Sequence, residues 1–182
     1  MVDAPGRRVV TGLGSDGRSR IVRCEPPAEA YRFRPPEGGV DSHSLTGMQA
    51  VSGFDPPDDG EVVTAELWAT HPTAAPSGFD PQQRHEGFDV ETLPGATKWR
   101  LVVMGAGWEA PMHRTGTVDY DLVVAGELEL RLDEGSVHLG PGDMVVLPGV
   151  AHGWRAGPSG ATLAVAMVGV AGIHDEPEEA QS

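Results

Sequence analysis

The sequence predicts an all-β protein, and the dense pattern from residue 97 onward is the main reason. Short runs rich in Val and Leu alternate there with Gly, Pro and Asp turns, as in "TKWRLVVMGAGW" and "GDMVVLPGVAHGW". No segment ahead of the C-terminal tail shows convincing helical periodicity. Short strands at close intervals without intervening helices are typical of a β-sandwich or barrel.

The 182 residues are expected to form one structural domain with three parts. Residues 1–96 are predicted to be an N-terminal arm with a hairpin and long Pro- and Gly-rich loops that pack on a barrel. Residues 97–172 are predicted to be the barrel itself, with turns at 133–135 and 140–143. Residues 173–182 form an acidic tail that we expect to be frayed.

The first element is a predicted β-hairpin at residues 7–24, "RRVVTGLGSDGRSRIVRC", in which two β-rich runs flank a Gly/Ser/Asp turn. Gly12, Gly14 and Gly17 also satisfy the dinucleotide-binding pattern G-x-G-x-x-G. The residues that follow lack the helical periodicity that would place a helix N-terminus at a pyrophosphate. The turn interpretation is therefore preferred.

Residues 25–96 are rich in Pro, Gly and Asp and contain one clear strand pattern, at 61–70. The tripeptide Gly-Phe-Asp occurs there three times, at 53–55, 78–80 and 87–89, and its unequal spacing argues against a solenoid. We expect each Phe to anchor a loop on the barrel, because an ordered loop needs apolar contacts to offset its lost entropy. A lid over a pocket is the alternative.

Charge and composition exclude several classes of partner. The formal net charge of -14 repels phosphate backbones and anionic lipid headgroups, so neither nucleic acid nor a membrane is expected as a partner. Cys24 is the only cysteine, which rules out an internal disulfide and a site of four thiolates. No apolar stretch approaches the roughly 20 residues of a membrane span, and we expect a cytoplasmic protein.

The segment "TVDYDLVVAG" (117–126) has the alternation of a half-buried strand. Two acids, Asp119 and Asp121, fall on the same face of that strand. Carboxylates that face a barrel interior are costly unless they are paired, protonated or bound to a cation. One face of the strand carries Asp119, Asp121, Val123 and Ala125, and the other carries Tyr120, Leu122 and Val124.

Two motifs in residues 99–170 resemble those of the cupin superfamily, written G-x5-H-x-H-x(3,4)-E-x6-G and G-x5-P-x-G-x2-H-x3-N. In the first, Thr115 replaces the second His and Asp119 replaces Glu. In the second, one residue is missing between Pro148 and His152, and Ala156 replaces Asn. The matching residues are Gly107, His113, Asp119 and Gly126 in the first motif and Gly142, Pro148, Gly149 and His152 in the second.

This resemblance implies a jelly-roll β-barrel in which His113, His152 and Asp119 meet inside a cup. The string "HRTGTVDY" further resembles a subgroup of small bacterial cupins that reads H-x-T-x-T-x-D-Y. Two imidazoles and a carboxylate form a possible ligand set for Fe, Mn, Ni or Zn. Without a metal, the same three side chains can work as general acid and base. Both alternatives stay open, because the usual cupin set has three His and one Glu.

Further residues are expected to contact a substrate in this cup. Thr115 and Thr117 can donate hydrogen bonds to a carbonyl. Trp154 forms part of an apolar wall, and Arg100 can hold an anionic group. Tyr120 and Trp99 are expected to pack rather than to react. The predicted substrate-binding residues are Arg100, Thr115, Thr117, Asp121 and Trp154.

Three classes of function are compatible with the sequence. The first is an enzyme acting on an aromatic or polyketide-like small molecule, as an oxygenase with a divalent metal or as a cyclase, isomerase, dehydratase or decarboxylase without one. The second is a non-catalytic module that binds a small ligand, and the third is a packed scaffold, which inward-facing charges disfavour. Fold alone does not choose among them. A homodimer is expected, in which the hairpin covers a neighbour's sheet edge. The alternative is a hairpin that folds back on its own barrel.

Overall fold

The computed structural model describes residues 6–27, 29–34, 48–52, 54–72 and 92–172. Every regular element in these ranges is a strand. The strands are β1 (Arg8–Leu13), β2 (Ser19–Glu25), β3 (Glu29–Phe33), β4 (Gln49–Ser52), β5 (Val62–Ala69), β6 (Thr97–Met104), β7 (Glu109–His113), β8 (Thr117–Leu132), β9 (Gly135–Leu139), β10 (Met144–Pro148) and β11 (His152–Gly169).

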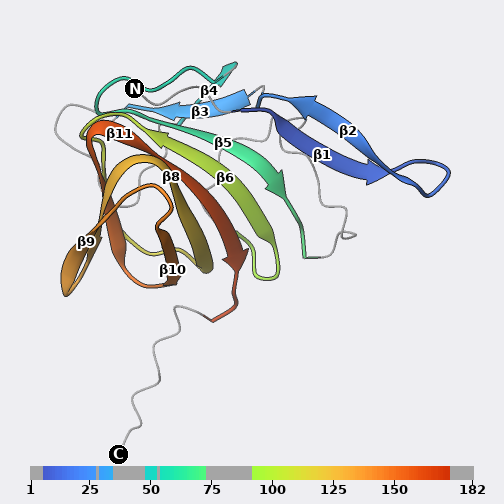
Figure 1. Ribbon diagram of the computed structural model, residues 1–182. Coiled ribbons are helices and arrows are strands. Elements are labelled where there is room, and N and C mark those ends of the chain that lie inside the picture. The colour runs from blue at the N-terminus through green and yellow to red at the C-terminus, as the bar shows by residue number, and fades with distance from the viewer. Residues whose placement is uncertain (1–5, 28, 35–47, 53, 73–91, 173–182) are drawn as a thin grey trace, which may run out of the picture.

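Nine strands form one continuous antiparallel sheet that folds over on itself (Figure 1). Its main path runs β10-β8-β11-β6-β5-β3-β4, while β9 pairs with β8 and β7 pairs with β11. β8 and β11 are long enough to take part in both layers of the fold. In one layer, residues Thr117 to Ala125 of β8 pair with residues Thr162 to Gly169 of β11. In the other layer, residues Leu128 to Arg131 of β8 pair with β11.

The two long strands bend together where they cross from one layer to the other. Gly126 pairs with Ala161, and the register shifts between Ala156 and Ala161. Gly126 and Gly160 both have positive φ, at 75° and 73°. A Cβ on Gly126 would strike the backbone of Gly160, so the bend needs glycine at this position.

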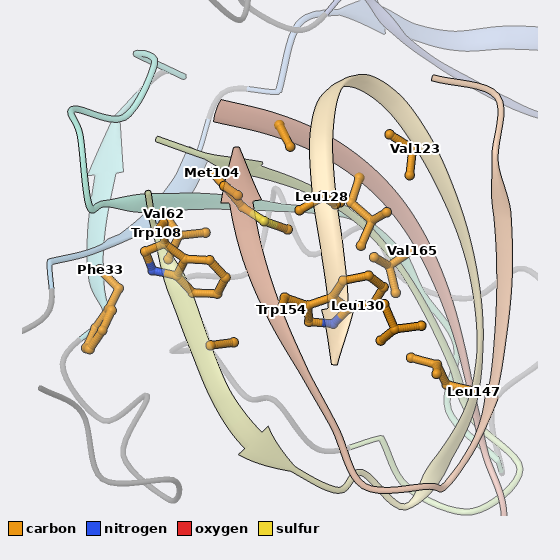
Figure 2. Close-up of a cluster of buried hydrophobic side chains, with 14 of the residues drawn as sticks. Phe33, Val62, Met104, Trp108, Val123, Leu128, Leu130, Leu147, Trp154 and Val165 are labelled. Carbon is orange, nitrogen blue, oxygen red and sulfur yellow. The ribbon is translucent and has the colours of Figure 1, made fainter. Parts of the chain in front are cut away.

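The first sheet is the layer formed by β10, β6, β5, β3, β4 and the parts of β8 and β11 that pair between Thr117–Ala125 and Thr162–Gly169. The second sheet is the other layer, formed by β9, β7 and the remaining parts of β8 and β11. The main hydrophobic core lies between the two sheets, with Val123, Leu163 and Val165 from the first and Leu130 and Trp154 from the second (Figure 2). The prediction of an all-β jelly roll is confirmed.

The predicted N-terminal hairpin is also confirmed. β1 and β2 pair with each other as a separate two-stranded sheet, and the turn between them contains Gly17 with φ 75°. Figure 1 shows this hairpin extending away from the barrel. Its base is held by Arg8, whose buried guanidinium donates a 2.9 Å hydrogen bond to the carbonyl of Leu67 in β5.

The sheet continues across residue 97, the predicted start of the barrel. β5 pairs with β6 from Val62 to Ala69, and β3 pairs with β5. A second, smaller core on the outer side of β5 contains Phe54 of the first Gly-Phe-Asp repeat, packed with Val63 and Ala65. Phe54 therefore has the predicted anchoring position, and the other two repeats lie outside the described residues.

Within the part of the chain that the structure describes, no helix has the length and apolar character needed to cross a bilayer.

Candidate active site

The inner face of β8 carries the predicted polar residues in strict alternation. Thr117, Asp119 and Asp121 are buried, whereas Tyr120 and Leu122 are exposed on the other side. The burial pattern follows from the two-residue period of a strand, of which one face lines the barrel interior. The predicted assignment of faces in this segment therefore agrees with the structure, except that Ala125 at the bend is only half-buried.

The two motif histidines lie side by side in the second sheet. His113 is the last residue of β7, His152 is the first of β11, and the two are direct partners across the strand pair. Their ring centroids are 4.3 Å apart, with the planes inclined at 54°. His152 is buried and contacts the core residue Trp154 edge-on, at a centroid distance of 6.0 Å. The histidine pair therefore faces the same interior as the core.

Both imidazole rings are held by a hydrogen bond to a backbone carbonyl two residues earlier in the chain. Nδ1 of His113 lies 2.9 Å from the carbonyl oxygen of Pro111, and Nδ1 of His152 lies 2.9 Å from the carbonyl oxygen of Val150. A carbonyl oxygen can only accept a hydrogen bond, so in each case Nδ1 carries the proton. The lone pair of each neutral imidazole is then on Nε2, the nitrogen that remains for a ligand or a proton.

Burial keeps His152 neutral. It lowers the pKa of His152 from 6.5 to about 4, and a charge on neighbouring His113 acts in the same direction, while the hydrogen bond to Val150 opposes them. A positive charge on His113 therefore disfavours a second one on His152.

Whereas the pKa of His152 is lowered, the pKa values of the two carboxyl groups on β8 are raised. Burial, with a smaller contribution from the charge of neighbouring Asp119, raises the pKa of Asp121 to about 8. Burial also raises the pKa of Asp119, against the lowering effects of the Thr117 and Thr115 hydroxyls and of the charges of Arg100 and His113. One oxygen of each carboxyl group, Oδ1, is buried without a hydrogen-bond partner among the described residues. Such an oxygen is available to a bound molecule.

The predicted substrate-binding threonines are buried beside Asp119. The hydroxyl of Thr117 donates a 2.8 Å hydrogen bond to the hydroxyl of Thr115. Thr115 occupies the place where a second motif histidine is usual, so a neutral hydroxyl replaces an imidazole at this point of the interior. The side chain of Asp119 therefore lies beside the two threonine hydroxyls, with His113 and Arg100 also near it.

Apolar side chains form the rest of this interior. Figure 2 shows Trp154 between the two layers, near Leu130 and Val165. Leu147 pairs across strands with Asp119, and Val165 pairs with Asp121, so apolar residues flank both acids on the inner face of the first sheet. The predicted position of Trp154 in the wall agrees with its burial in the core.

Arg100 lies on the inner face of β6, in the same cross-strand row as Asp121 and Val165. Its Nε donates a 2.6 Å hydrogen bond to Oε1 of Glu66, and both side chains are buried. The structure thus places the predicted anion-binding arginine inside the barrel, with a carboxylate already bound to it.

The donor set fits a metal ion only in part. The carbonyl-held Nδ1 atoms of His113 and His152 leave both Nε2 atoms as donors, which is the arrangement of metal-binding histidines. Among the described residues, however, no three His, Cys, Asp or Glu side chains are grouped so that they could hold a metal. The structure does not assemble Asp119 with the two imidazoles as a third ligand.

Sequence analysis did not identify the groups that orient the predicted residues. The carbonyls of Pro111 and Val150 and the carboxylate of Glu66 were all missed. The two carbonyls have no sequence signal, because every residue follows a carbonyl two positions earlier and only the path of the chain directs it at the ring. Glu66 had no signal either, because its pairing with Arg100 depends on the register of two strands that are far apart in the chain.

A jelly roll with a histidine pair at the β7 and β11 termini and acids on β8 is the architecture that the two sequence motifs imply. No protein-family model matches the chain. The cupin-domain-containing oxidoreductase srdD of Neurospora crassa is 41% identical over 158 residues, which are 83% of this chain and 68% of that protein. The chain belongs to the cupin superfamily.

Two further relatives extend this comparison. The cupin-domain-containing oxidoreductase fogC of Aspergillus ruber is 35% identical over 157 residues, which are 81% of this chain and 62% of that protein. Phomopsin biosynthesis cluster protein C' of Diaporthe leptostromiformis is 31% identical over 119 residues, 65% of this chain and 54% of the relative. The chain spans about half the length of the phomopsin cluster relatives that it matches.

Proposed function

We propose that the protein is a cupin-type enzyme that moves protons on an aromatic or polyketide-like small molecule bound between the two sheets. The observation that carries this proposal is that two imidazoles and two carboxyl groups, with pKa values shifted in opposite directions at His152 and Asp121, lie in one interior. The Nδ1 atoms of two imidazoles are fixed by carbonyls, and two buried carboxyl groups each have an oxygen without a hydrogen-bond partner among the described residues.

The pKa directions support a division of roles. His152 is neutral at pH 7, because its pKa is lowered to about 4, and the imidazole pair supplies the base. Asp121 is the acid, because its pKa is raised to about 8 and it holds its proton at neutral pH. Groups whose pKa values are shifted apart in this way are typical of acid–base sites.

The chemistry is the enolisation of a carbonyl compound. Nε2 of His113, which is less buried than His152, takes a proton from the carbon next to the carbonyl, and Asp121 gives its proton to the carbonyl oxygen. The C–H electron pair becomes the new C=C bond, and the C=O π pair becomes the O–H bond. Return of the proton to a different carbon isomerises the substrate, and attack of the enol on a second carbonyl cyclises it.

Two observations support the substrate class. The walls beside the acids are apolar and include the indole of Trp154, which suits a flat, largely unsaturated molecule. Several relatives are named as biosynthesis cluster proteins or as cupin-domain-containing oxidoreductases, which is compatible with an enzyme of small-molecule biosynthesis.

The test is solvent exchange by protein treated with EDTA. Acetophenone and 2-acetylnaphthalene are incubated with the protein in D₂O, and deuterium at the α-carbon is followed by NMR. We expect exchange that falls about 10²- to 10⁴-fold in a His113→Gln/His152→Gln double variant. The matched control is His138→Gln, an exposed histidine on β9, which should exchange like the wild type.

Exchange that is equal in the wild type and the double variant contradicts the assignment of the base. A protein that binds either ketone without incorporating deuterium acts as a binding module rather than an enzyme. That outcome would overturn the catalytic proposal and favour the alternative of a non-catalytic small-ligand-binding cupin.

An oxidoreductase that uses a divalent metal is the second candidate. The arrangement that favours it is the pair of Nε2 donors at His113 and His152, together with the names of the two oxidoreductase relatives. A bound Fe, Mn or Ni would supply redox or Lewis-acid chemistry. The two histidines would then hold it from one side of the interior.

A further inference from the structure

The inner face of the first sheet carries a buried polar row that continues beyond the acids of the candidate site. Cross-strand register pairs Asp121 of β8 with Val165 of β11, and Val165 with Arg100 of β6. Arg100 in turn pairs with Glu66 of β5. All four residues are buried. The row therefore leads from one acid of the site, across a single valine, to a buried arginine and a buried glutamate.

The arginine of this row already has a carboxylate beside it. Nε of Arg100 lies 2.6 Å from Oε1 of Glu66, and the exposed fractions of the two side chains are only 5% and 10%. Little water competes for either charge at such depth, so the two charges are strongly coupled. The positive charge of Arg100 is therefore matched by Glu66 before any ligand enters the interior.

This ion pair lies within electrostatic reach of the candidate site. Burial raises the pKa of Asp119, and the positive charge of Arg100 is among the influences that lower it. Electrostatic effects weaken with distance and are screened less in a buried interior than in water. A ligand group bound beside Asp119 is therefore also affected by the charges of Arg100 and Glu66.

The other charges of the same interior do not attract an anion. Among the described residues of the first sheet, Arg100 is the only buried cation. Asp119 and Asp121 are acids, and burial lowers the pKa of His152 to about 4, so that its ring adds no positive charge at pH 7. Lys98 lies in the cross-strand row of Asp119, but it is only half-buried, and water screens its charge.

A carboxylate and an uncharged carbonyl group therefore meet different conditions between the two sheets. A carboxylate that enters loses its hydration, finds a buried cation that is already paired, and lies close to the two acids of β8. An uncharged ketone loses much less hydration, and its oxygen can accept a hydrogen bond from a protonated carboxyl group. Of two ligands with the same shape, the interior favours the uncharged one.

We propose that Glu66 is a specificity-determining residue, which holds Arg100 so that the interior selects uncharged carbonyl compounds and rejects carboxylates of the same shape. The inference rests on the proposed function, because it concerns the ligand that binds between the two sheets. It also gives Arg100 a different role from the one expected from the sequence. The arginine that was predicted to hold an anionic substrate group holds Glu66 instead.

The same ion pair also joins β5 to β6, and a purely structural pair would produce a different result. Its loss would lower the stability of the protein without changing which of two similar ligands binds more tightly. Selectivity between matched ligands, rather than stability or affinity for one ligand, is therefore the quantity that tests the proposal.

The test is equilibrium dialysis of the full chain at pH 7 against 2-acetylnaphthalene and 2-naphthoate, with EDTA present so that no adventitious metal binds the carboxylate. The two ligands differ only in a methyl group and a negatively charged oxygen. We expect the wild type to bind the ketone at least about 10-fold more tightly. Glu66→Gln removes the carboxylate that faces Arg100 and should raise the affinity for 2-naphthoate at least about 10-fold, with the ketone affinity changed by less than about 3-fold.

Two further variants isolate the charge of Arg100. Glu109→Gln is the matched control, because Oε1 of Glu109 also lies 2.6 Å from an arginine Nε, that of Arg155, but both side chains are exposed. It should leave the selectivity unchanged. The double variant Glu66→Gln/Arg100→Gln removes both charges, so that neither is left buried without the other. It should not gain affinity for 2-naphthoate.

A wild type that binds 2-naphthoate as tightly as the ketone overturns the proposal, and this comparison does not depend on the folding of any variant. A Glu66→Gln variant that binds the ketone but gains no affinity for 2-naphthoate also overturns it, as does a gain that persists in the double variant.

Deuterium exchange separates this inference from the proposed function. If the expected selectivity is found in a protein that incorporates no deuterium, the inference stands and the catalytic proposal fails. If exchange occurs while 2-naphthoate binds as tightly as the ketone, the catalytic proposal stands and the role of Glu66 is wrong. A protein that binds neither ligand contradicts both.

Discussion

At the scale of single residues, the site depends on groups that the sequence pattern locates and on others that it does not. Strand alternation was sufficient to place Asp119 and Asp121 on the inner face of β8. Motif spacing predicted that His113 and His152 belong to the same site, and in the structure they are direct cross-strand partners. Their tautomers follow from backbone carbonyls, whose directions depend on the local path of the chain and cannot be derived from residue type.

The acids should make the protein less stable as the pH rises. The pKa of Asp121 is raised from 3.8 to about 8, so between these values the unfolded chain has lost the proton that the folded chain retains. The stability present at low pH is therefore lost progressively from about pH 4 to about pH 8.

The change Asp121→Asn tests this effect, because an amide of the same shape has no proton to lose. We expect it to raise the free energy of unfolding at pH 7 by a few kcal/mol, since each unit of pKa shift is about 1.4 kcal/mol, and to flatten the pH dependence. Urea unfolding at pH 5 and pH 8 measures both. A variant as pH-dependent as the wild type would show that Asp121 ionises normally.

At the scale of elements, the position of the site depends on the shared bend of β8 and β11. The bend carries Asp119 and Asp121 in one sheet and His152 in the other, so it sets the histidine pair opposite the acids. The hairpin and the two turns after β8 were predictable from Gly, Pro and Asp. The unbroken run of β8 through Gly126 was not, because a glycine inside a strand pattern reads equally well as a strand end.

The change Gly126→Ala should disrupt the bend. Gly126 has φ 75°, and an added Cβ would strike the backbone of Gly160. We expect a loss of roughly 2–4 kcal/mol in the free energy of unfolding. The control is Gly140→Ala, where an added Cβ has nothing within 4 Å and which should change stability by less than about 1 kcal/mol. Equal, small losses in both variants, measured by urea unfolding, would show that the bend does not need glycine.

At the scale of the whole molecule, one sheet folds over on itself, and its outer side carries exposed apolar residues such as Tyr120, Met144 and Val146. The fold class was predictable because patterning largely decides it. The pairing of β3 and β5 with the barrel was not, since it joins strands separated by Pro- and Gly-rich segments whose path the sequence does not specify. The outward positions of Tyr120 and Val146 are visible in the alternation of β8 and β10, but only the strand order and register show that the two residues are neighbours.

Metal content is a property of the whole purified protein and decides between the two catalytic candidates. With two imidazole donors and no third ligand grouped beside them among the described residues, we expect weak, substoichiometric metal. Elemental analysis of protein purified without chelator or metal-affinity resin measures it. One equivalent of Fe, Mn, Ni or Zn that is lost in His113→Ala and in His152→Ala would establish the metal-dependent candidate instead.

The state of the histidine pair is the basis of the whole account, and ¹⁵N NMR of histidine-labelled protein between pH 4 and 8 measures it directly. His152→Gln assigns the signal. The account predicts that at pH 7 the ring of His152 is neutral with its proton on Nδ1, and that it remains neutral until the pH approaches about 4. A proton on Nε2 at pH 7, or titration near the ordinary value of 6.5, would contradict it.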